Sequence, residues 1–120
     1  MCSDPMPSVG DIIADNGGSA GFVLSHLRVT PEAVDFSSLA VSMTRKGEPF
    51  ITGTTRAVMA GNPADSVAWL VNRLSEWGAM LSAGLVVLTG AMATAETVSA
   101  GDTFEADFGV LGRLGVGFRA

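Results

Sequence analysis

A short stretch in the first half of the chain alternates apolar and polar residues, and this alternation predicts a β-hairpin. In the run LAVSMT, residues 39–44, large apolar side chains occupy every second position, as in a strand that buries one face. Lys46 and Gly47 follow as the turn, and the run PFITG, residues 49–53, returns beside the first strand. We therefore expect two antiparallel strands between residues 39 and 55.

A different period governs the run GNPADSVAWLVNRLSEWG, residues 61–78, and predicts a helix. Its apolar residues at positions 67, 70, 71, 74 and 77 recur at spacings of three and four, which places them on one helical face. Asn62 suits the N-cap, Pro63 the first helical position and Gly78 the C-terminal cap. The pattern favours packing of this face, with Trp69 and Trp77, in the core over any cofactor-binding role.

The remaining apolar runs predict short strands at residues 21–25 and 85–91, two strands flanking the turn SAGD within residues 96–108, and a last strand within 112–120. Residues 1–10 are expected to be irregular, and residues 29–38 a connecting loop. Strands and helices do not alternate, so the expected fold is α+β and mainly β. We predict a single domain, residues 11–120, with an antiparallel-rich mixed sheet roll and one amphipathic helix.

The composition is apolar for a small domain. Of the 120 residues, 48% are hydrophobic and 16% charged, although a small domain has a large surface relative to its volume. One interpretation is a face that another chain, another domain or a missing part of the same fold would cover. The other is a surface rich in alanine and in the 15 glycines, which raise the apolar count without forming large patches.

The charge pattern argues against several partners. The formal net charge is −5, and the seven lysines and arginines are scattered singly, so no basic stripe is available to neutralise phosphates. No apolar run approaches the ~20 residues that span a bilayer, and the first residues lack the regions of a signal peptide. The single cysteine, Cys2, cannot form an internal disulfide. We expect a cytoplasmic protein that binds neither nucleic acid nor membrane.

The titratable side chains form no strong catalytic or metal-binding motif. The one histidine, His26, is interpreted as a surface or loop residue. Glu105 and Asp107 share a strand face, as an Mg²⁺ site would need, but no third acid is near and a solvated strand face is favoured. Asp11 and Asp15 are a second acidic pair, in a segment too short to predict as a helix. A zinc site is not expected, because the sequence has no His/Cys cluster.

Two polar spots stand beside apolar runs. The first is the loop from Asp15 to Ser19, with an acid, the amide of Asn16, two glycines and a hydroxyl. The second is Thr89-Gly90 at the end of the apolar run VVL, where the glycine permits close approach of a ligand. Loops at strand ends commonly carry function. An ordinary turn with an Asx-type hydrogen bond explains the first spot equally well, so both interpretations stay open.

These two spots belong to four blocks that resemble a known family. The blocks are IADNGGSAGFVLS, MTRKGEPFITGTTRAVMAGNPADSVAWLVNRL, LSAGLVVLTGAM and VSAGDTFEADFGVLGRLGVGF. In order and spacing they resemble the C-terminal half of the 2-keto-4-pentenoate hydratase family, which includes 4-oxalocrotonate decarboxylases and has the fumarylacetoacetate hydrolase fold. The resemblance covers about residues 11–119.

The resemblance implies a lyase of aromatic meta-cleavage degradation. Family hydratases add water to 2-hydroxypenta-2,4-dienoate and require Mg²⁺ or Mn²⁺, which polarises the 2-oxo acid. By resemblance, Asn16 and Ser19 are the catalytic candidates on the loop beside the substrate. Asp15, Thr89 and Gly90 are the substrate-binding candidates in the same pocket.

Several positions depart from the family pattern. The metal-binding glutamates and the assisting lysine of the family lie upstream of the Ala-Asp-Asn loop, and this chain has no counterpart of that segment. Leu85 replaces an acid, Asn62 replaces the histidine of Gly-His-Pro, and Gly17 and Gly18 replace Ala and Ser. We therefore expect a partial fold with no metal ligand of its own, completed by an N-terminal half or by homo-oligomerisation.

The resemblance leaves alternatives to the hydratase. One is 4-oxalocrotonate decarboxylation, because the pocket residues that separate the two reactions lie largely in the absent half. Another is a non-catalytic association module or truncated remnant, which the missing metal ligands favour. A third is a protein that binds small 2-oxo acids without turnover.

Overall fold

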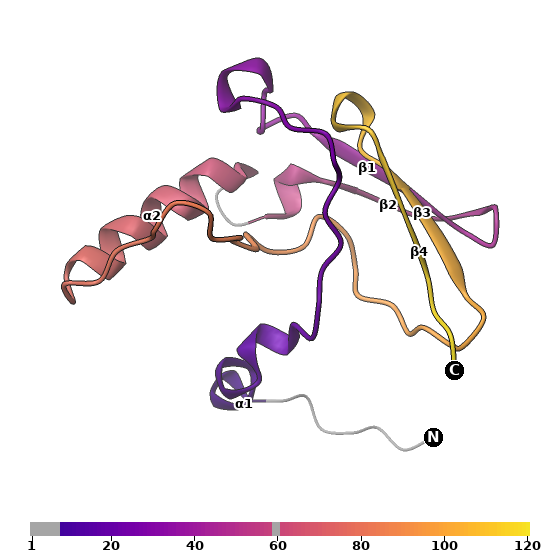
Figure 1. Cartoon of the computed structure of the whole chain (residues 1–120), viewed down its shortest axis with the longest axis horizontal. Helices are drawn as coiled ribbons and strands as arrows, with labels where there is room; N and C mark the ends of the chain where they lie inside the picture. The colour runs from indigo at the N-terminus through magenta and orange to yellow at the C-terminus, as the bar shows by residue number, and fades with distance from the viewer. Residues whose placement is uncertain (1–7, 59–60) are drawn as a thin grey trace.

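Four strands form one antiparallel sheet in the computed structural model, which describes residues 8–58 and 61–120. They are β1 (Ala40–Arg45), β2 (Glu48–Thr54), β3 (Thr103–Asp107) and β4 (Arg113–Gly117), in the spatial order β2-β1-β3-β4. All three neighbouring pairs are antiparallel. Figure 1 shows the sheet on one side of the molecule and the long helix on the other. The expected mainly β, antiparallel-rich architecture is confirmed.

The β1–β2 hairpin forms where the alternating pattern predicts it. Its turn residues, Lys46 and Gly47, both have positive φ, at 52° and 87°, as the tight hairpin turns with the favoured twist require. The register shifts between Met43 and Thr44, and such an irregularity locally bends the pair of strands. The hairpin is therefore determined by local sequence.

The two faces of the sheet differ in polarity, as the period of two predicts. Val41, Phe104 and Ala106 are buried on the inner face. Glu105 on the outer face of β3 is exposed, and Asp107 beside it is half-buried. Among the described residues the only other buried apolar side chain is Val58, so the core is small and lies against the sheet.

Helix α2 (Pro63–Ser75) has the ends that its sequence predicts. The side chain of Asn62 accepts a hydrogen bond from the backbone N–H of Ala64 at 3.0 Å. At the other end Gly78 has a φ of 69°, and the N–H of Ala79 donates to the carbonyl of Leu74 at 3.0 Å. That bond is the signature of a Schellman cap.

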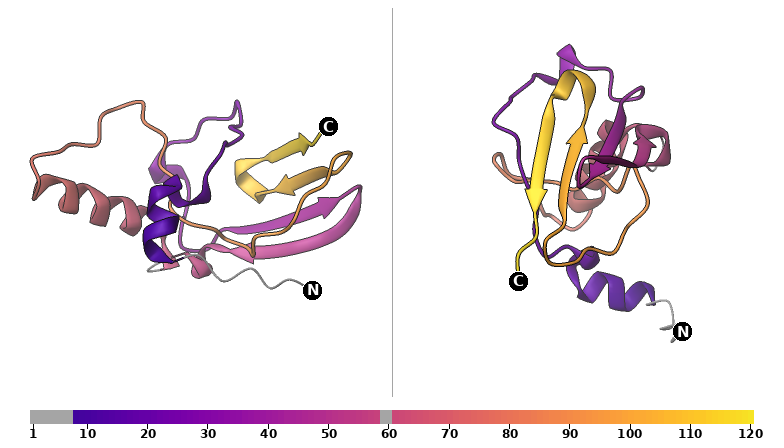
Figure 2. Two further views of the ribbon diagram at one scale, coloured as in Figure 1. Left: turned by 90° about the horizontal axis from the view of Figure 1, so that it is seen from below. Right: turned by 90° about the vertical axis from the view of Figure 1, so that its right-hand side faces the viewer.

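The apolar face of α2 does not enter the core, so the expectation for its side chains is wrong. Trp69 is 57% exposed, Trp77 is 76% exposed, and Ser66 is the only buried residue of the helix. Figures 1 and 2 give the reason, because α2 extends away from the sheet and covers neither of its faces. Val67, Leu70 and Leu74 of the predicted stripe are half-buried, and Leu70 lies near the loop that follows the helix and not near the sheet.

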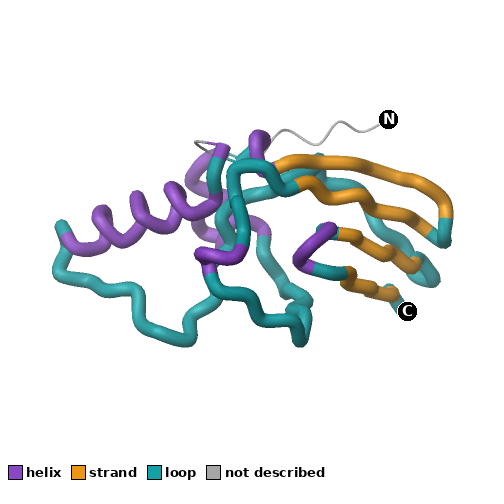
Figure 3. The backbone as a smooth tube through the Cα atoms, turned by 90° about the horizontal axis from the view of Figure 1, so that it is seen from above, coloured by secondary structure: helices purple, strands orange, loops and turns teal. Residues whose placement is uncertain are grey.

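Three predicted strands are wrong as well. Residues 21–25, 85–91 and 96–98 lie outside any strand, although apolar side chains such as Phe22 and Leu88 occur in them. Figure 3 shows these segments as loops. An apolar run becomes a strand only when a sheet edge pairs with its backbone, and the described sheet pairs only β1 to β4 with one another.

The N-terminal segment differs from the prediction in the opposite direction. A short helix α1 (Val9–Ala14) begins inside the stretch expected to be irregular, whereas residues 1–7, with Cys2, lie outside the described residues. The Ser8 side chain accepts a hydrogen bond from the Asp11 N–H, and the Asp11 carboxylate accepts from the Ser8 N–H. This reciprocal capping box explains a helix in so short a segment.

The rest of the described chain consists of short 3₁₀ turns and loops. The turns are η1 (Asn16–Gly18), η2 (Pro31–Ala33), η3 (Thr55–Ala57) and η5 (Gly109–Leu111).

The chain exposes 9312 Å² of accessible surface, whereas a compact monomer of its mass exposes roughly 6,100 Å² by the usual size scaling. No helix in residues 8–58 and 61–120 has the length and apolarity to cross a membrane.

We expect Asn62→Ala to destabilise α2 by about 1 kcal/mol, because the N-terminal amides lose their side-chain acceptor. Urea unfolding followed by far-UV circular dichroism measures the change. Asn72→Ala is the matched control, since Asn72 is exposed within the same helix and alanine has the higher helix propensity. Equal losses in both variants would contradict a capping role for Asn62.

Candidate functional site

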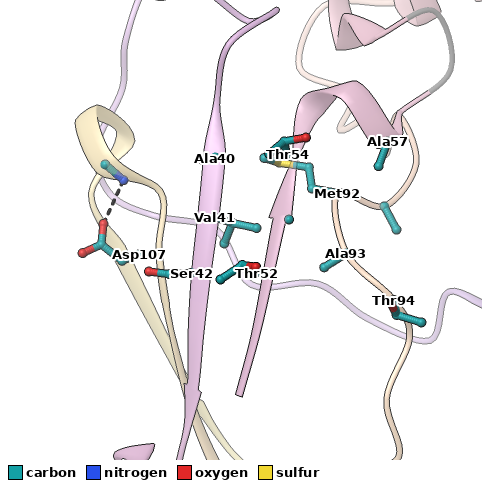
Figure 4. Close-up of a pocket in the computed structure, with 13 residues that line it drawn as sticks. Ala40, Val41, Ser42, Thr52, Thr54, Ala57, Met92, Ala93, Thr94 and Asp107 are labelled. Atoms are coloured by element: carbon teal, nitrogen blue, oxygen red, sulfur yellow. Dashed lines mark hydrogen bonds between the residues drawn. The ribbon is translucent and has the colours of Figure 1, made fainter. Parts of the chain in front are cut away.

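The largest hollow lies between the β1–β2 hairpin and the segment 91–94, and we call it the central pocket. Its volume is about 990 Å³, and Ser42, Thr52, Thr54 and Thr94 contribute hydroxyl groups to its lining. Asp107 supplies the one carboxylate, as Figure 4 shows. No described lysine or arginine lines it. The central pocket therefore offers hydrogen bonds but no cation for an anionic ligand.

A close backbone contact holds the segment 91–94 against β2. The N–H of Thr54 donates to the carbonyl of Met92 at 3.1 Å. A Cβ on Gly53 would lie 2.0 Å from that carbonyl oxygen, so only glycine permits the approach. Gly53 thereby shapes one wall of the central pocket.

A second hollow, the loop pocket, brings together two of the predicted site residues. Asn16 and Ser19 line it with the apolar residues Phe22, Leu70, Leu81 and 85–88, around a volume of about 400 Å³. Asn16 has a φ of 52°, and its amide donates to the carbonyl of Ser19 at 3.4 Å. This contact is not the Asx turn that the sequence left open, because the side-chain nitrogen donates to a carbonyl three residues on, whereas an Asx side chain bonds the backbone two residues on. It leaves one amide hydrogen of Asn16 for another acceptor.

The other predicted site residues lie beside the loop pocket and are not among its lining residues. The lining ends at Leu88, and Thr89 and Gly90 follow directly in the chain, before the segment 91–94 of the central pocket. Gly90 has a φ of 113°, which favours glycine there. Asp15 is exposed and ends α1. The Thr89-Gly90 pair thus connects the two pockets along the sequence.

The acidic pair on β3 is engaged with an arginine. The Nε of Arg113 lies 2.8 Å from Asp107, and its Nη1 lies 3.5 Å from Glu105. A hydrogen bond from the Gly109 N–H, followed by that from Arg113, lowers the pKa of Asp107. These contacts agree with the favoured interpretation of a strand face over a metal site.

In the acidic pair near the N-terminus, Asp11 has a structural role in capping α1. The pKa of the Asp11 carboxyl is lowered because it accepts hydrogen bonds from the hydroxyl and the N–H of Ser8. Asp15 is the C-cap residue of α1, and its backbone N–H donates to the carbonyl of Asp11. No group of three His, Cys, Asp or Glu residues within residues 8–58 and 61–120 is placed to hold a metal ion. His26 is exposed, as expected.

The most strongly held titratable group is one that the sequence interpretation treated only as part of a turn. Asp102 is 1% exposed, and its carboxylate lies 2.5 Å from the Arg45 Nη2 and 3.1 Å from the Lys46 Nζ. It also accepts a hydrogen bond from the Ser99 N–H at 2.9 Å. Arg45 is the largest cause of a pKa lowered to about 2. The sequence signal for this site was an acidic residue in a turn, directly after Gly101 and two positions before Phe104.

Comparisons with known proteins give consistent matches. The family model described as "Fumarylacetoacetate (FAA) hydrolase C-terminal" matches residues 3–118. The 2-keto-4-pentenoate hydratase of Paraburkholderia xenovorans (strain LB400) is 34% identical over 110 residues, which are 92% of this chain and 40% of that protein. The 2-oxo-hept-4-ene-1,7-dioate hydratase of Escherichia coli is also 34% identical, over 92% of this chain and 41% of its own length.

A solved structure matches over the same part of the chain. The 4-oxalocrotonate decarboxylase from Pseudomonas putida G7, complexed with magnesium and adipate, is 34% identical with a TM-score of 0.82. The match covers 90% of this chain and 41% of the decarboxylase chain. The chain therefore spans about two fifths of the length of the relatives it matches.

Gly53→Ala is expected to displace the segment 91–94 from β2, because the added methyl group would meet the Met92 carbonyl. Loss of amide protection at Thr54 in hydrogen exchange measures the displacement. Gly21→Ala is the control, since nothing lies within 4 Å of a Cβ there and its φ is not positive. A Thr54 amide that stays protected in Gly53→Ala would contradict the claim that the close approach of Met92 requires glycine at position 53.

Asp102→Asn is expected to remove an acid-dependent part of the stability. The folded pKa of Asp102 is about 2 and its reference value is 3.8, so its contribution is complete above about pH 4 and is lost as the pH falls towards 2. The wild type should therefore unfold at higher urea than the variant at pH 5, and the gap should narrow by pH 2. Glu48→Gln, at an exposed position, is the control. A gap independent of pH would contradict the assignment.

Proposed function

The chain belongs to the fumarylacetoacetate hydrolase C-terminal family, and we propose from this premise that it supplies the substrate-lining part of a hydratase. The substrate class is 2-hydroxypenta-2,4-dienoate, or 2-keto-4-pentenoate, of aromatic meta-cleavage degradation. The resemblance inferred from the four sequence blocks is confirmed, since relatives bearing hydratase and decarboxylase names match over about nine tenths of the chain. The activity of the whole enzyme is the proposal for this chain.

The observation that carries the proposal is the meeting of Asn16 and Ser19 with residues 85–88 in the loop pocket. A hydroxyl and an amide stand on one side, as donors for the carboxylate or keto oxygens of a small acid. Leucine and valine side chains stand on the other, as an apolar wall for the diene carbons. Such a combination of a few polar groups with an apolar lining is usual for a small-molecule site.

The role proposed for each predicted site residue requires no metal ligand from this chain. Ser19 donates a hydrogen bond to a substrate oxygen, and Asn16 orients the same end of the substrate. Thr89 and Gly90 bring the following backbone close to the substrate, and Asp15 faces the polar end from the loop. The roles of Asn16 and Ser19 rest on the family resemblance and on the pocket that they share, and those of Asp15, Thr89 and Gly90 rest on the resemblance alone.

The divalent metal of the family does not fit any group of side chains within residues 8–58 and 61–120. The solved decarboxylase is complexed with magnesium or calcium, but Glu105 and Asp107 are paired with Arg113 here, and Asp102 is paired with Arg45 and Lys46. A hard cation needs several oxygen ligands at once. We infer that the Mg²⁺ or Mn²⁺ ligands come from polypeptide other than these residues, and we assign no reaction step to the metal.

The exposed apolar surface also supports the proposal that other polypeptide completes the site. Trp77 is 76% exposed and Leu85 is 61% exposed, and these residues flank an uncharged stretch that leads into the loop pocket. Contiguous exposed apolar surface of this kind marks an interaction site. A complementary segment that carries the metal ligands, or a second copy of the chain, would cover it.

The runner-up is decarboxylation of 4-oxalocrotonate, favoured by the TM-score of 0.82 to the decarboxylase of Pseudomonas putida G7. The two functions differ in product. Hydration consumes the dienoate without release of gas, whereas decarboxylation releases CO₂ from a dicarboxylate. A chain that only associates would do neither.

The test mixes the purified chain with the upstream part of the Paraburkholderia hydratase and follows the diene absorbance with Mg²⁺ or Mn²⁺ present. We expect no turnover by the chain alone and turnover by the mixture. Ser19→Ala in the mixture should lower kcat/KM by roughly 10- to 100-fold, because a hydrogen bond to a charged group contributes about 1.5–3 kcal/mol. Ser75→Ala, exposed on α2, is the control.

Each outcome decides between the candidates. Absence of turnover in every mixture that forms a complex would exclude the hydratase. CO₂ release from 4-oxalocrotonate without dienoate hydration would favour the decarboxylase. Substrate binding that is indifferent to EDTA and leads to no product would favour a binding module.

A further inference from the structure

A separate apolar cavity lies on the inner face of the sheet, under the segment that precedes β3. Its volume is about 240 Å³. Met43, Phe50 and Phe104 come from the sheet, Phe118 follows β4, and Val98 and Glu96 come from the covering segment. None of the predicted site residues lines it, so the cavity is distinct from the proposed substrate pocket.

Three phenylalanines form a preorganised wall of this cavity. The rings of Phe50 and Phe104 have centroids 5.7 Å apart with an interplanar angle of 58°, and Phe104 and Phe118 meet edge to face at 5.9 Å. These are the separations and tilts that aromatic pairs prefer. Phe104 is only 8% exposed, and ring contacts on two sides hold it in place. A ligand ring would therefore meet a surface that is already ordered.

The charges beside the cavity disfavour an anion. The guanidinium of Arg45 lies over the rings of Phe50 and Phe104 at 5.5 and 5.7 Å, but Asp102 already neutralises it. Glu96 is the one charged residue among the described residues of the lining, and its carboxylate would repel an anion. A carboxylate ligand would lose its hydration without gaining an unpaired cation.

The size and polarity of the cavity indicate its occupant. An engineered apolar cavity of about 150 Å³ in another protein stays dry and binds benzene. The present cavity is larger and opens to solvent beside Val98, which is 43% exposed. Among its described lining residues only Thr94 and Glu96 have polar side chains, so water inside it would find few hydrogen-bond partners. We propose that it binds a neutral molecule with a single apolar ring, of the size of toluene. This inference goes beyond the proposed function, whose substrate is an anion in the loop pocket.

The test titrates toluene into the 120-residue chain labelled with ¹³C at the methionine methyl groups. Met43 lines the cavity, whereas Met80 is 84% exposed on the surface. We expect saturable intermolecular NOEs from toluene to the Met43 methyl group and none to that of Met80. Benzoate should bind at least tenfold more weakly than toluene.

A filled-cavity variant provides the second measurement. Val98→Phe should weaken toluene binding at least tenfold, since the added ring takes the ligand's place. Val110→Phe, at a position 74% exposed and outside the cavity, should leave binding unchanged. NOEs to Met80 in place of Met43, equal binding of benzoate, or an unchanged affinity in a folded Val98→Phe would overturn the proposal. Should Val98→Phe not fold, the two methionine signals decide alone.

Discussion

The buried carboxylate of Asp102 is the interaction on which the arrangement of the sheet depends. It joins the turn before β3 to Arg45 and Lys46 at the tip of the β1–β2 hairpin, 57 positions away from Arg45 in the sequence. Its backbone groups also bond to Ser99 and Phe118. A buried charge is costly unless it is paired and hydrogen-bonded, and here the contacts with Arg45 and Lys46 also tie the turn before β3 to the β1–β2 hairpin.

The consequence is a sheet with an ordered aromatic inner face, against which helix α2 does not pack. Arg45 reaches Asp102 across the rings of Phe50 and Phe104, so the charged network and the aromatic wall support each other. Helix α2 carries an equally regular apolar stripe, yet Trp77 at its end is 76% exposed. The molecule thus combines a satisfied interior around β1, β2 and β3 with an apolar surface of the kind that a protein partner covers.

This division also explains what the chain contributes to its proposed chemistry. In the proposed function, the loop from Asp15 to Ser19 and the segment leading to Thr89 would provide hydrogen-bond donors and an apolar wall that position a small acid. Asp11 caps α1, Asp102 pairs with Arg45 and Lys46, and Glu105 and Asp107 pair with Arg113. No group of three His, Cys, Asp or Glu side chains among the described residues is placed to hold a metal ion. Substrate positioning and metal binding would therefore belong to different stretches of polypeptide.

The sequence by itself determined the elements whose causes are local. The β1–β2 hairpin follows from its alternation and from the Lys46-Gly47 turn, and α2 follows from Asn62, Pro63 and Gly78, because all of these signals act within a few residues. The resemblance to the family was equally readable, since it depends on the order of short blocks. The resemblance predicted Asn16 and Ser19 in one pocket with Thr89 and Gly90, whereas the loop pocket is lined by residues 85–88, which directly precede that pair.

Only the tertiary structure decided which apolar runs are paired or buried. Residues 21–25 and 85–91 have the composition of strands but pair with no strand of the sheet, and the stripe of α2 does not pack against the sheet. Asp102 looked like a turn residue because its partners, Arg45 and Lys46, are distant in the sequence. A local pattern states what a segment can form, whereas burial and pairing depend on which distant groups the complete fold brings within reach.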